Sequence, residues 1–403
     1  MTKRLINPEL DELVRQMNRV DGHDGVVEGE DPSARGLDPP SIRDVQGDEP
    51  LERLLVEMVQ RKASDLLLIP GAPPVLRING ELAATAEPAV DGEAVRMLLA
   101  PHLGARSNRL LAETGSTDIP LRLAGSSGGA WRLRVNVQRQ RGELAAAIRA
   151  LPQRIPTLEE LRLPADLADL VSTDQGLVLV CGPTGCGKST TLAALLDVIN
   201  RNRARHVITI EDPIEYEHAN RRSVFEQVEI GRDAPSFGLA LRAALRRDPD
   251  VLLVGEMRDR ETISTVVTAA ETGHLILSTL HTGTATQAIH RIVDVFPGDQ
   301  QQQIRFQLAL SLRAVVCQQL VPTADGRTRV PGLEVLVATP AVRNLIRHGR
   351  IEQLYNELAV GSGHGMRTME RSLATLVKDG VISREEALER AFLPQEFERA
   401  LNL

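Results

Sequence analysis

The stretch GPTGCGKST constrains this 403-residue chain more than any other part of its sequence. It satisfies the pattern G-x-x-x-x-G-K-[ST], follows an apolar segment at 177–181 and precedes a predicted helix at 191–199. In that setting backbone N–H groups converge on phosphate oxygens, the lysine reaches the β and γ phosphates, and the next hydroxyl is offered to Mg²⁺. The stretch therefore predicts a site for ATP and Mg²⁺ rather than a glycine-rich turn without nucleotide. Its residues are Gly182, Pro183, Thr184, Gly185, Cys186, Gly187, Lys188, Ser189 and Thr190.

The composition is that of an ordinary globular protein. Hydrophobic residues make up 42% of the chain and charged residues 25%. No apolar run reaches the ~18 residues that a membrane span needs. Charges scattered through the first twenty residues do not fit a secretory signal, which predicts a cytoplasmic protein. The three cysteines, Cys181, Cys186 and Cys317, are too few for a four-cysteine zinc site.

The charge of the chain is concentrated at its start. Residues 1–50 hold six Lys or Arg against twelve Asp or Glu, which accounts for most of the net charge of -7. Neither residues 1–50 nor the rest of the chain has the excess of basic residues that a nucleic-acid surface needs. Aromatic residues make up only 2% of the chain. These features argue against nucleic acid as a partner, so a nucleic-acid motor remains only an outside alternative.

The pattern of residues predicts an α/β protein with several parts. Residues 1–50 are expected to form a short amphipathic helix and a flexible tether, with the helix either docking a partner or capping its own domain. A small α/β domain is expected at 51–150, a linker at 151–160 and a larger domain at 161–403. The larger domain alternates strands and helices, as a mostly parallel sheet would. Its strands are expected at 177–181, 207–211, 251–254 and 275–280; beyond about 297 the pattern is helical, apart from a strand pair around 328–340.

Acidic residues follow two of these predicted strands. The predicted strand at 207–211 ends in Glu211 and is followed by Asp212 and Glu215. The predicted strand at 251–254 is followed by Glu256. Ligands of open α/β sheets bind at the carboxyl ends of strands, where one carboxylate can hold Mg²⁺ and another can orient the attacking water. The alternative is that these carboxylates cap a helix or pair with Arg258.

Two histidines flank the predicted strand at 275–280. His281 follows its carboxyl end, on the predicted nucleotide side, and His274 precedes its other end. An imidazole beside a γ-phosphate can report whether that phosphate is present. The alternative is a histidine whose ring only satisfies local hydrogen bonds.

Four stretches, in their order and spacing, resemble the signature boxes of the secretion ATPases of type II secretion and type IV pili. They are GPTGCGKSTT, ITIEDPIEYEH, LRAALRRDPDVLLVGEMRDRET and AAETGHLILSTLHTGTA. Within that family the chain is most similar to the pilus-retraction, or twitching-motility, branch. This similarity rests on KASDLLLIPGAPPVLRING and ATPAVRNLIRHGRIEQLYNEL.

The resemblance implies a PAS-like N-terminal domain, a RecA-like P-loop core, a helical C-terminal region and a homohexamer with nucleotide between subunits. It implies that Glu215 activates water and that Glu256, with Ser189, lies near Mg²⁺. It also implies that His281 and His274 form the histidine pair. Arg132 and Arg134 lie on a strand that would present arginines to a nucleotide, the alternative being a solvated strand face.

The expected function is therefore ATP-driven pilus retraction at the cytoplasmic face of the inner membrane, on a platform protein of the pilus. The alternatives are a pilus assembly or type II secretion ATPase, or a regulatory paralogue with low turnover. The lack of four clustered cysteines favours retraction over assembly, whereas the acidic extension is not typical of the retraction branch. The segment from Val342 to Arg347 is expected to transmit force, unless Arg343 and Arg347 only share a solvated helix face.

Overall fold

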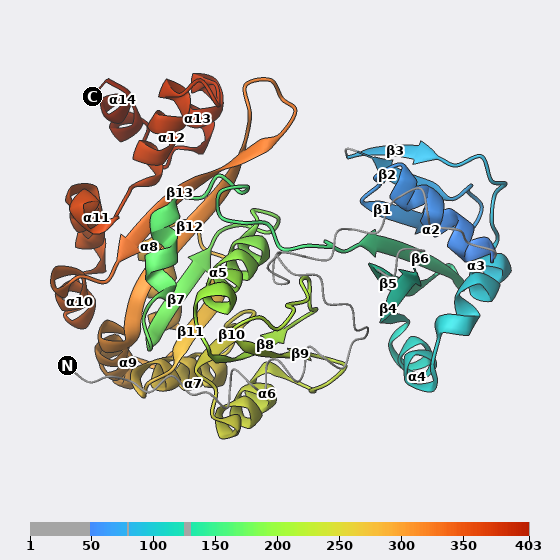
Figure 1. The fold of residues 1–403 in the computed structure, drawn as a ribbon, viewed down its shortest axis with the longest axis horizontal. Helices are drawn as coiled ribbons and strands as arrows, with labels where there is room; N and C mark the ends of the chain where they lie inside the picture. Colours follow the sequence, from blue (N-terminus) through green and yellow to red (C-terminus); the bar gives the residue numbers. More distant parts are fainter. Residues whose placement is uncertain (1–48, 79, 125–129, 403) are drawn as a thin grey trace, which may run out of the picture. The chain divides into compact units, whose positions relative to one another are not determined.

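The computed structural model describes residues 49–402 except residue 79 and residues 125–129, so the helix and tether expected before residue 49 lie outside the described part. The described chain forms two compact units, one ending at Arg154 and the other beginning at Ile155 (Figure 1). Among the described residues, no helix combines the length and the apolar character needed to cross a membrane.

Within its described residues, the N-terminal unit is an antiparallel sheet with three α-helices. Its strands run in the order β3-β2-β1-β6-β5-β4. The strands are β1 (Asp65–Leu68), β2 (Val75–Ile78), β3 (Glu81–Ala84), β4 (Ser116–Ala124), β5 (Ala130–Gln140) and β6 (Glu143–Ala150). The helices are α2 (Pro50–Gln60), α3 (Gly92–Leu99) and α4 (Ala105–Thr114).

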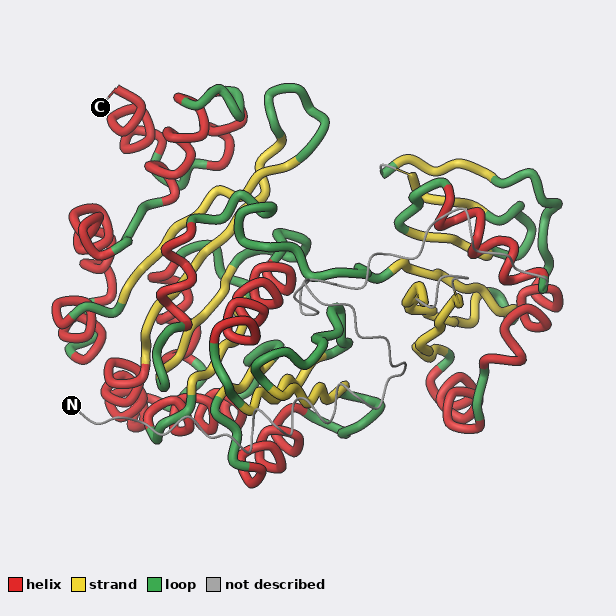
Figure 2. Tube along the Cα trace, viewed as in Figure 1, coloured by secondary structure: helices red, strands yellow, loops and turns green. Residues whose placement is uncertain are grey.

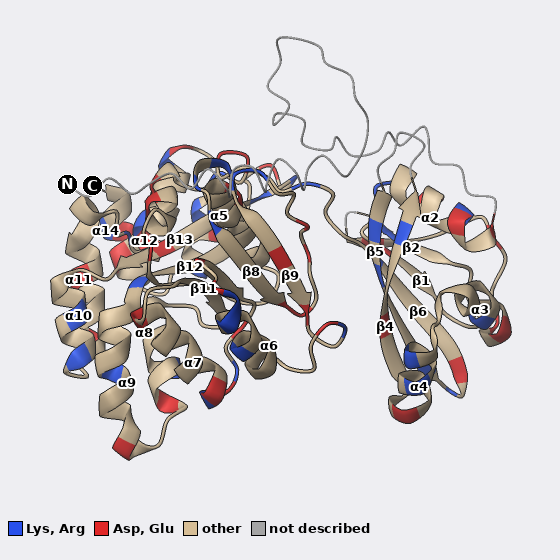
Figure 3. Cartoon of the chain, turned by 60° about the horizontal axis from the view of Figure 1, so that its bottom comes forward, with Lys and Arg blue, Asp and Glu red and all other residues tan. Residues whose placement is uncertain are grey.

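Alternation along β5 explains how this unit folds. Leu133, Val135 and Val137 are buried, whereas the residues between them are partly exposed. The buried positions share one apolar cluster with residues of all three helices, so the helices pack on one face of the sheet. The opposite face of β5 carries Arg132 and Arg134, and Figure 3 marks basic residues on this strand.

The second unit is built on a seven-stranded sheet in the order β13-β12-β7-β11-β10-β8-β9. All neighbouring pairs are parallel except β12 with β13. The strands are β7 (Gly176–Cys181), β8 (His206–Glu211), β9 (Val224–Glu229), β10 (Val251–Val254), β11 (Leu275–Leu280), β12 (Leu312–Pro322) and β13 (Arg329–Val337). The helices are α5 (Lys188–Asn202), α6 (Phe237–Ala244), α7 (Arg260–Glu271), α8 (Ala285–Asp294), α9 (Gly298–Ser311), α10 (Pro340–Arg347), α11 (Leu354–Val360), α12 (Met369–Lys378), α13 (Arg384–Arg390) and α14 (Pro394–Asn402).

Helices cover both faces of this sheet (Figure 2). Every residue of β7 is buried, but alternate residues belong to different cores. Leu177 and Leu179 pack in the cluster that contains α7 to α10, whereas Val178 and Val180 pack in the cluster that contains α5. A strand buried on both faces has a continuous apolar sequence, which is why β7, β10 and β11 could be predicted from sequence.

The expectation of helix after residue 297 is wrong for residues 312–322. These residues form β12, which pairs in parallel with β7 and antiparallel with β13. The strand pair expected around 328–340 is a single strand, β13, whose partner is β12. A short apolar run such as AVVC fits a buried strand as well as a helix, and pairing with β7 decides the outcome. The sequence pattern also missed β4 and β9.

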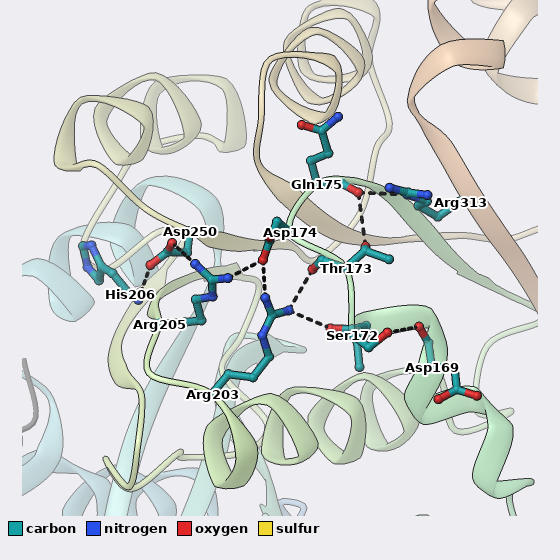
Figure 4. Close-up of polar contacts among 11 residues, drawn as sticks. Asp169, Ser172, Thr173, Asp174, Gln175, Arg203, Arg205, His206, Asp250 and Arg313 are labelled. Atoms are coloured by element: carbon teal, nitrogen blue, oxygen red, sulfur yellow. Dashed lines mark hydrogen bonds and ion pairs between the residues drawn. The ribbon is translucent and has the colours of Figure 1, made fainter. Parts of the chain in front are cut away.

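An arginine–aspartate network joins the amino ends of β7, β8 and β10 (Figure 4). Arg203 and Arg205 both contact the carboxylate of Asp174. Arg205 also donates to Asp250 over 2.7 Å, and the backbone N–H of His206 donates to the same carboxylate over 2.9 Å. This edge of the sheet is therefore held by charge pairs, whereas the carboxyl edge carries the acidic residues that follow the strands.

Arg343 is not on a solvated helix face. Its guanidinium donates to the carbonyls of Ala309 (2.7 Å), Leu310 (2.6 Å), Leu312 (2.8 Å) and Ala338 (2.9 Å). Carbonyls in the last turn of a helix lack partners within the helix, so Arg343 caps α9 and holds the start of β12. Burial lowers the pKa of Arg343 below its ordinary value.

Replacing Arg343 with alanine should destabilise the fold by about 2 kcal/mol, because several carbonyls lose a charged donor. Urea unfolding of the purified chain measures this change. Arg347→Ala is the matched control, since Arg347 is exposed and only stacks over the Phe306 ring at 5.4 Å. Its loss should cost no more than about 1 kcal/mol. Equal, small effects in both variants would contradict a capping role for Arg343.

Candidate active site

The phosphate-binding loop joins β7 to α5. The strand ends at Cys181 and the helix begins at Lys188. Gly182 and Gly187 have φ angles of 140° and 91°, which residues with a side chain rarely adopt. A Cβ on Gly182 would lie 2.3 Å from the backbone oxygen of Gln318, so β12 leaves no room for a side chain there.

Lys188 lies inside this loop. It is 9% exposed, and its Nζ donates to the carbonyls of Gly182 and Pro183, each over 2.9 Å. These two bonds keep the ammonium over the loop, on the side where phosphate would approach the start of α5.

A cavity of about 490 Å³ opens on the loop at the carboxyl edge of the sheet. Its walls come from the loop and α5 and from the segments that follow β8, β10 and β11. The predicted site residues that line it are Thr184, Gly185, Gly187, Lys188, Ser189, Thr190, Glu215, Glu256 and His281. Three predicted residues of the loop, Gly182, Pro183 and Cys186, are not among those that line this cavity.

Glu256 lies between two basic groups. Its side chain is 14% exposed; one carboxylate oxygen contacts Arg258, and the other lies 3.4 Å from Nε2 of His281. The pairing with Arg258 that the sequence left as an alternative is therefore present, and it coexists with the position of Glu256 on the cavity wall.

Glu211 also lines the cavity, although the family resemblance singled out Glu215 and assigned no role to Glu211. Burial raises its pKa to about 7, although Thr209 (2.7 Å) and Gln227 (3.4 Å) donate hydrogen bonds to its Oε1. A carboxyl group whose pKa lies near neutrality can take or release a proton at working pH. The signal for Glu211 in sequence was only its place at the end of an apolar strand.

Aromatic residues of the same segment were missed altogether. The hydroxyl of Tyr216 lies 3.0 Å from Oγ1 of Thr190, which joins this segment to α5. The ring of His218 stacks on Phe225 with 4.5 Å between centroids, and burial lowers the pKa of His218 to about 4. His218 therefore stays neutral near pH 7 and acts as a packed wall of the cavity.

The other predicted residues lie elsewhere. Nδ1 of His274 lies 3.1 Å from the carbonyl of Ala269 at the amino end of β11, so the two histidines sit at opposite ends of that strand. Arg132 and Arg134 belong to β5 of the N-terminal unit, where Arg134 pairs with Asp118 over 3.2 Å.

A protein-family model described as "Type II/IV secretion system protein" matches residues 45–359. The chain belongs to this family, and its fold class is the one predicted: a RecA-like P-loop core with a PAS-like N-terminal α/β domain and a helical C-terminal region. It is a P-loop ATPase and binds nucleotide.

Its relatives identify the branch of the family. The chain is 41% identical to the type IV pilus retraction ATPase PilT of Pseudomonas aeruginosa, over 86% of this chain and 99% of that one. It is 40% identical to the type IV pilus ATPase PilU of the same organism, over 84% and 88% of the two chains. A crystal structure of the pilus retraction motor PilT with bound ADP matches with a TM-score of 0.81 and 44% identity, over 88% of this chain and 100% of that one. The similarity to the retraction branch is thus confirmed.

Glu211→Gln should make stability less sensitive to pH. Because the folded chain raises the pKa of Glu211 from 4.5 to about 7, only the folded state keeps this proton between those values, and stability falls as pH rises through that interval. The amide keeps the acceptor for Thr209 and removes the charge. The variant should therefore match the wild type near pH 4.5 and exceed it by up to about 3 kcal/mol at pH 8.

Urea unfolding from pH 4.5 to 8 measures this difference. Glu217→Gln, at an exposed position of the same segment, is the control and should follow the wild-type curve. Parallel curves for Glu211→Gln and the wild type would show that burial does not hold the proton on Glu211.

Proposed function

We propose that this chain is a hexameric motor that hydrolyses ATP to retract type IV pili and so powers twitching motility. The observation that carries the proposal is the 41% identity to a retraction ATPase over nearly the whole of that relative. We place the motor in the cytoplasm, at the inner face of the membrane, where it would act on a platform protein of the pilus. The alternative motors for assembly or secretion, and a low-turnover paralogue, are outcomes of the experiment below.

The donors around the cavity fit a magnesium–nucleotide complex. Ser189 offers a hydroxyl in the first turn of α5 and Glu256 offers a carboxylate from the segment after β10, and both line the same cavity. These two residues would hold Mg²⁺, directly or through water. The ion supplies charge that offsets the developing negative charge on the transferred phosphoryl group.

The remaining wall residues suit roles in hydrolysis. Glu215 would orient and deprotonate the attacking water, which is the work of a general base. His281 contacts Glu256 and would report whether the γ-phosphate is present. Lys188 would leave its two carbonyl partners to bind the β and γ phosphates.

The arginines of β5 complete the proposal. In a homohexamer with nucleotide between subunits, Arg132 and Arg134 of one subunit would stabilise charge on the nucleotide of its neighbour, as arginine fingers do. His274 would act from the amino end of β11, on the side away from the phosphates, and so affect assembly or coupling rather than the chemical step.

Glu215→Gln and Glu256→Gln should each keep ATP binding and reduce hydrolysis by about 10²-fold or more, because each removes a charge that acts on water or metal. Glu217→Gln, a glutamate of the same segment that does not line the cavity, is the matched control. In cells whose own copy is deleted, both variants should leave extra surface pili, as the deletion does. Loss of pili would identify an assembly motor, and unchanged piliation would identify a paralogue without a motor role.

Mixing two inactive variants tests whether Arg132 and Arg134 act on the nucleotide of a neighbouring subunit. Neither the Arg132→Ala/Arg134→Ala chain nor the Lys188→Ala chain should hydrolyse ATP alone. Mixed hexamers should recover part of the activity, because an intact loop then meets intact arginines of a neighbouring subunit. ATP turnover is measured on assemblies verified to contain both chains. No recovery in such assemblies would mean that the arginines do not act between subunits.

A further inference from the structure

One buried side chain joins β12 to the phosphate-binding loop and to the first turn of α5. Gln318 is 4% exposed. Its Nε2 donates to the backbone oxygen of Cys186 over 2.6 Å, and its Oε1 accepts from Oγ1 of Thr191 over 2.8 Å. Cys186 belongs to the loop and Thr191 to the first turn of α5. The amide group is therefore engaged on both sides.

The bond to Cys186 determines where an adjacent N–H points. A trans peptide is planar, so its carbonyl and the following N–H point in opposite directions. The carbonyl of Cys186 is turned toward β12, and the N–H of Gly187 in the same peptide is therefore turned away from β12. Gly187 lines the 490 Å³ cavity, whereas Gln318 does not. Gly187 also lines a second cavity of about 370 Å³, which Gln318 borders, so Gln318 contacts the loop from outside the 490 Å³ cavity.

Close packing keeps this arrangement in place. A Cβ on Gly187 would lie 2.9 Å from Nε2 of Gln318, and a Cβ on Gly182 would lie 2.3 Å from its backbone oxygen. The loop therefore rests directly on β12. The strand itself is fixed by pairing on both edges, with β7 and β13.

We propose that Gln318 is a positioning residue for the phosphate site: its side-chain amide holds the Cys186 carbonyl and thereby aims the Gly187 N–H at the bound phosphates. The proposal uses the assignment of the chain as a P-loop ATPase and is independent of what the motor moves. It assigns a role in nucleotide binding to a strand that the sequence pattern treated as helix.

Gln318→Leu removes both bonds while keeping most of the volume. It should weaken binding of ADP and of inorganic pyrophosphate by roughly 10-fold each, the effect of about 1.4 kcal/mol. The KM for ATP should rise by a similar factor while kcat stays within a few-fold, because the loop binds substrate and transition state alike.

Thr191→Val, which leaves the bond to Cys186 intact, should weaken binding only about 2-fold. Gln319→Leu, on the next residue of β12 and facing the other side of the sheet, should change neither constant.

Gln318→Glu tests the direction of the hydrogen bond. An ionised glutamate accepts from Thr191 but cannot donate to Cys186, whereas a protonated glutamate can do both. Its affinity for ADP should therefore improve as the pH is lowered, relative to the wild type measured at the same pH. A residue that only fills space would not produce this dependence.

Titration calorimetry with ADP and pyrophosphate gives the affinities, and thermal melting shows that each variant is folded. Wild-type affinity for both probes in folded Gln318→Leu would overturn the proposal. A changed preference for ATP over GTP with unchanged pyrophosphate binding would also overturn it, since Gln318 would then contact the base. If the leucine variant does not fold, the pH response of Gln318→Glu decides: a flat response relative to the wild type rejects the role.

Discussion

The pairing of β7 with β11 on one edge and β12 on the other fixes where the phosphate-binding loop leaves the sheet, and the other site residues at this edge follow β11 or strands paired outward from it. In this parallel arrangement the ends of the strands meet at one edge, and the phosphate-binding loop leaves β7 between its two neighbours. The segment carrying His281 follows β11, and Glu256 follows the next strand outward, β10. Because β7, β10 and β11 are buried, a shift of any one of them by one residue would move its apolar side chains to the core on the opposite face of the sheet. The sheet therefore fixes the points from which the segments that carry the site residues leave it.

The sequence was most informative where function depends on short, local patterns. The loop needs glycines and a lysine at fixed spacing, and a strand buried on both faces must be apolar throughout, so both can be found without a structure. Burial of Glu211 could not be predicted in this way. Burial in the cavity wall raises its pKa, and hydrogen bonds, including one from Gln227 of β9, offset part of that effect. The sequence pattern did not predict β9, and only the resemblance to the secretion ATPases favoured Glu215 over Glu211.

The strand β12 is a second element that the sequence pattern did not predict. Its apolar run was compatible with a helix, and only its long-range partners make it a strand. Both of its special contacts involve residues far apart in sequence. Arg343 holds the carbonyl of Leu312 at its start, and Gln318 holds the loop nearer its end. The signature segment of α10 is therefore tied by a direct bond to the strand that supports the phosphate site, so changes to α10 also act on the fold of the core.

The turn after His281 leads into α8, whose start is held by a buried carboxyl group of β13. The backbone N–H of Ala285, which begins α8, donates to the Glu334 carboxylate of β13 over 2.7 Å. Glu370 of α12, also buried, accepts from the N–H of Leu393 over 3.1 Å. Burial, with a further contribution from the charge of Glu370, raises the pKa of Glu334 to about 7. Two carboxyl groups that would repel each other when both are ionised thus hold the start of α8 and the start of α14. A shift of α8 relative to β13 would leave a buried N–H without an acceptor, at a cost of about 1–3 kcal/mol. The start of α8, which follows His281, and the residue before α14 are thus each held by a buried carboxyl group, Glu334 of β13 and Glu370 of α12.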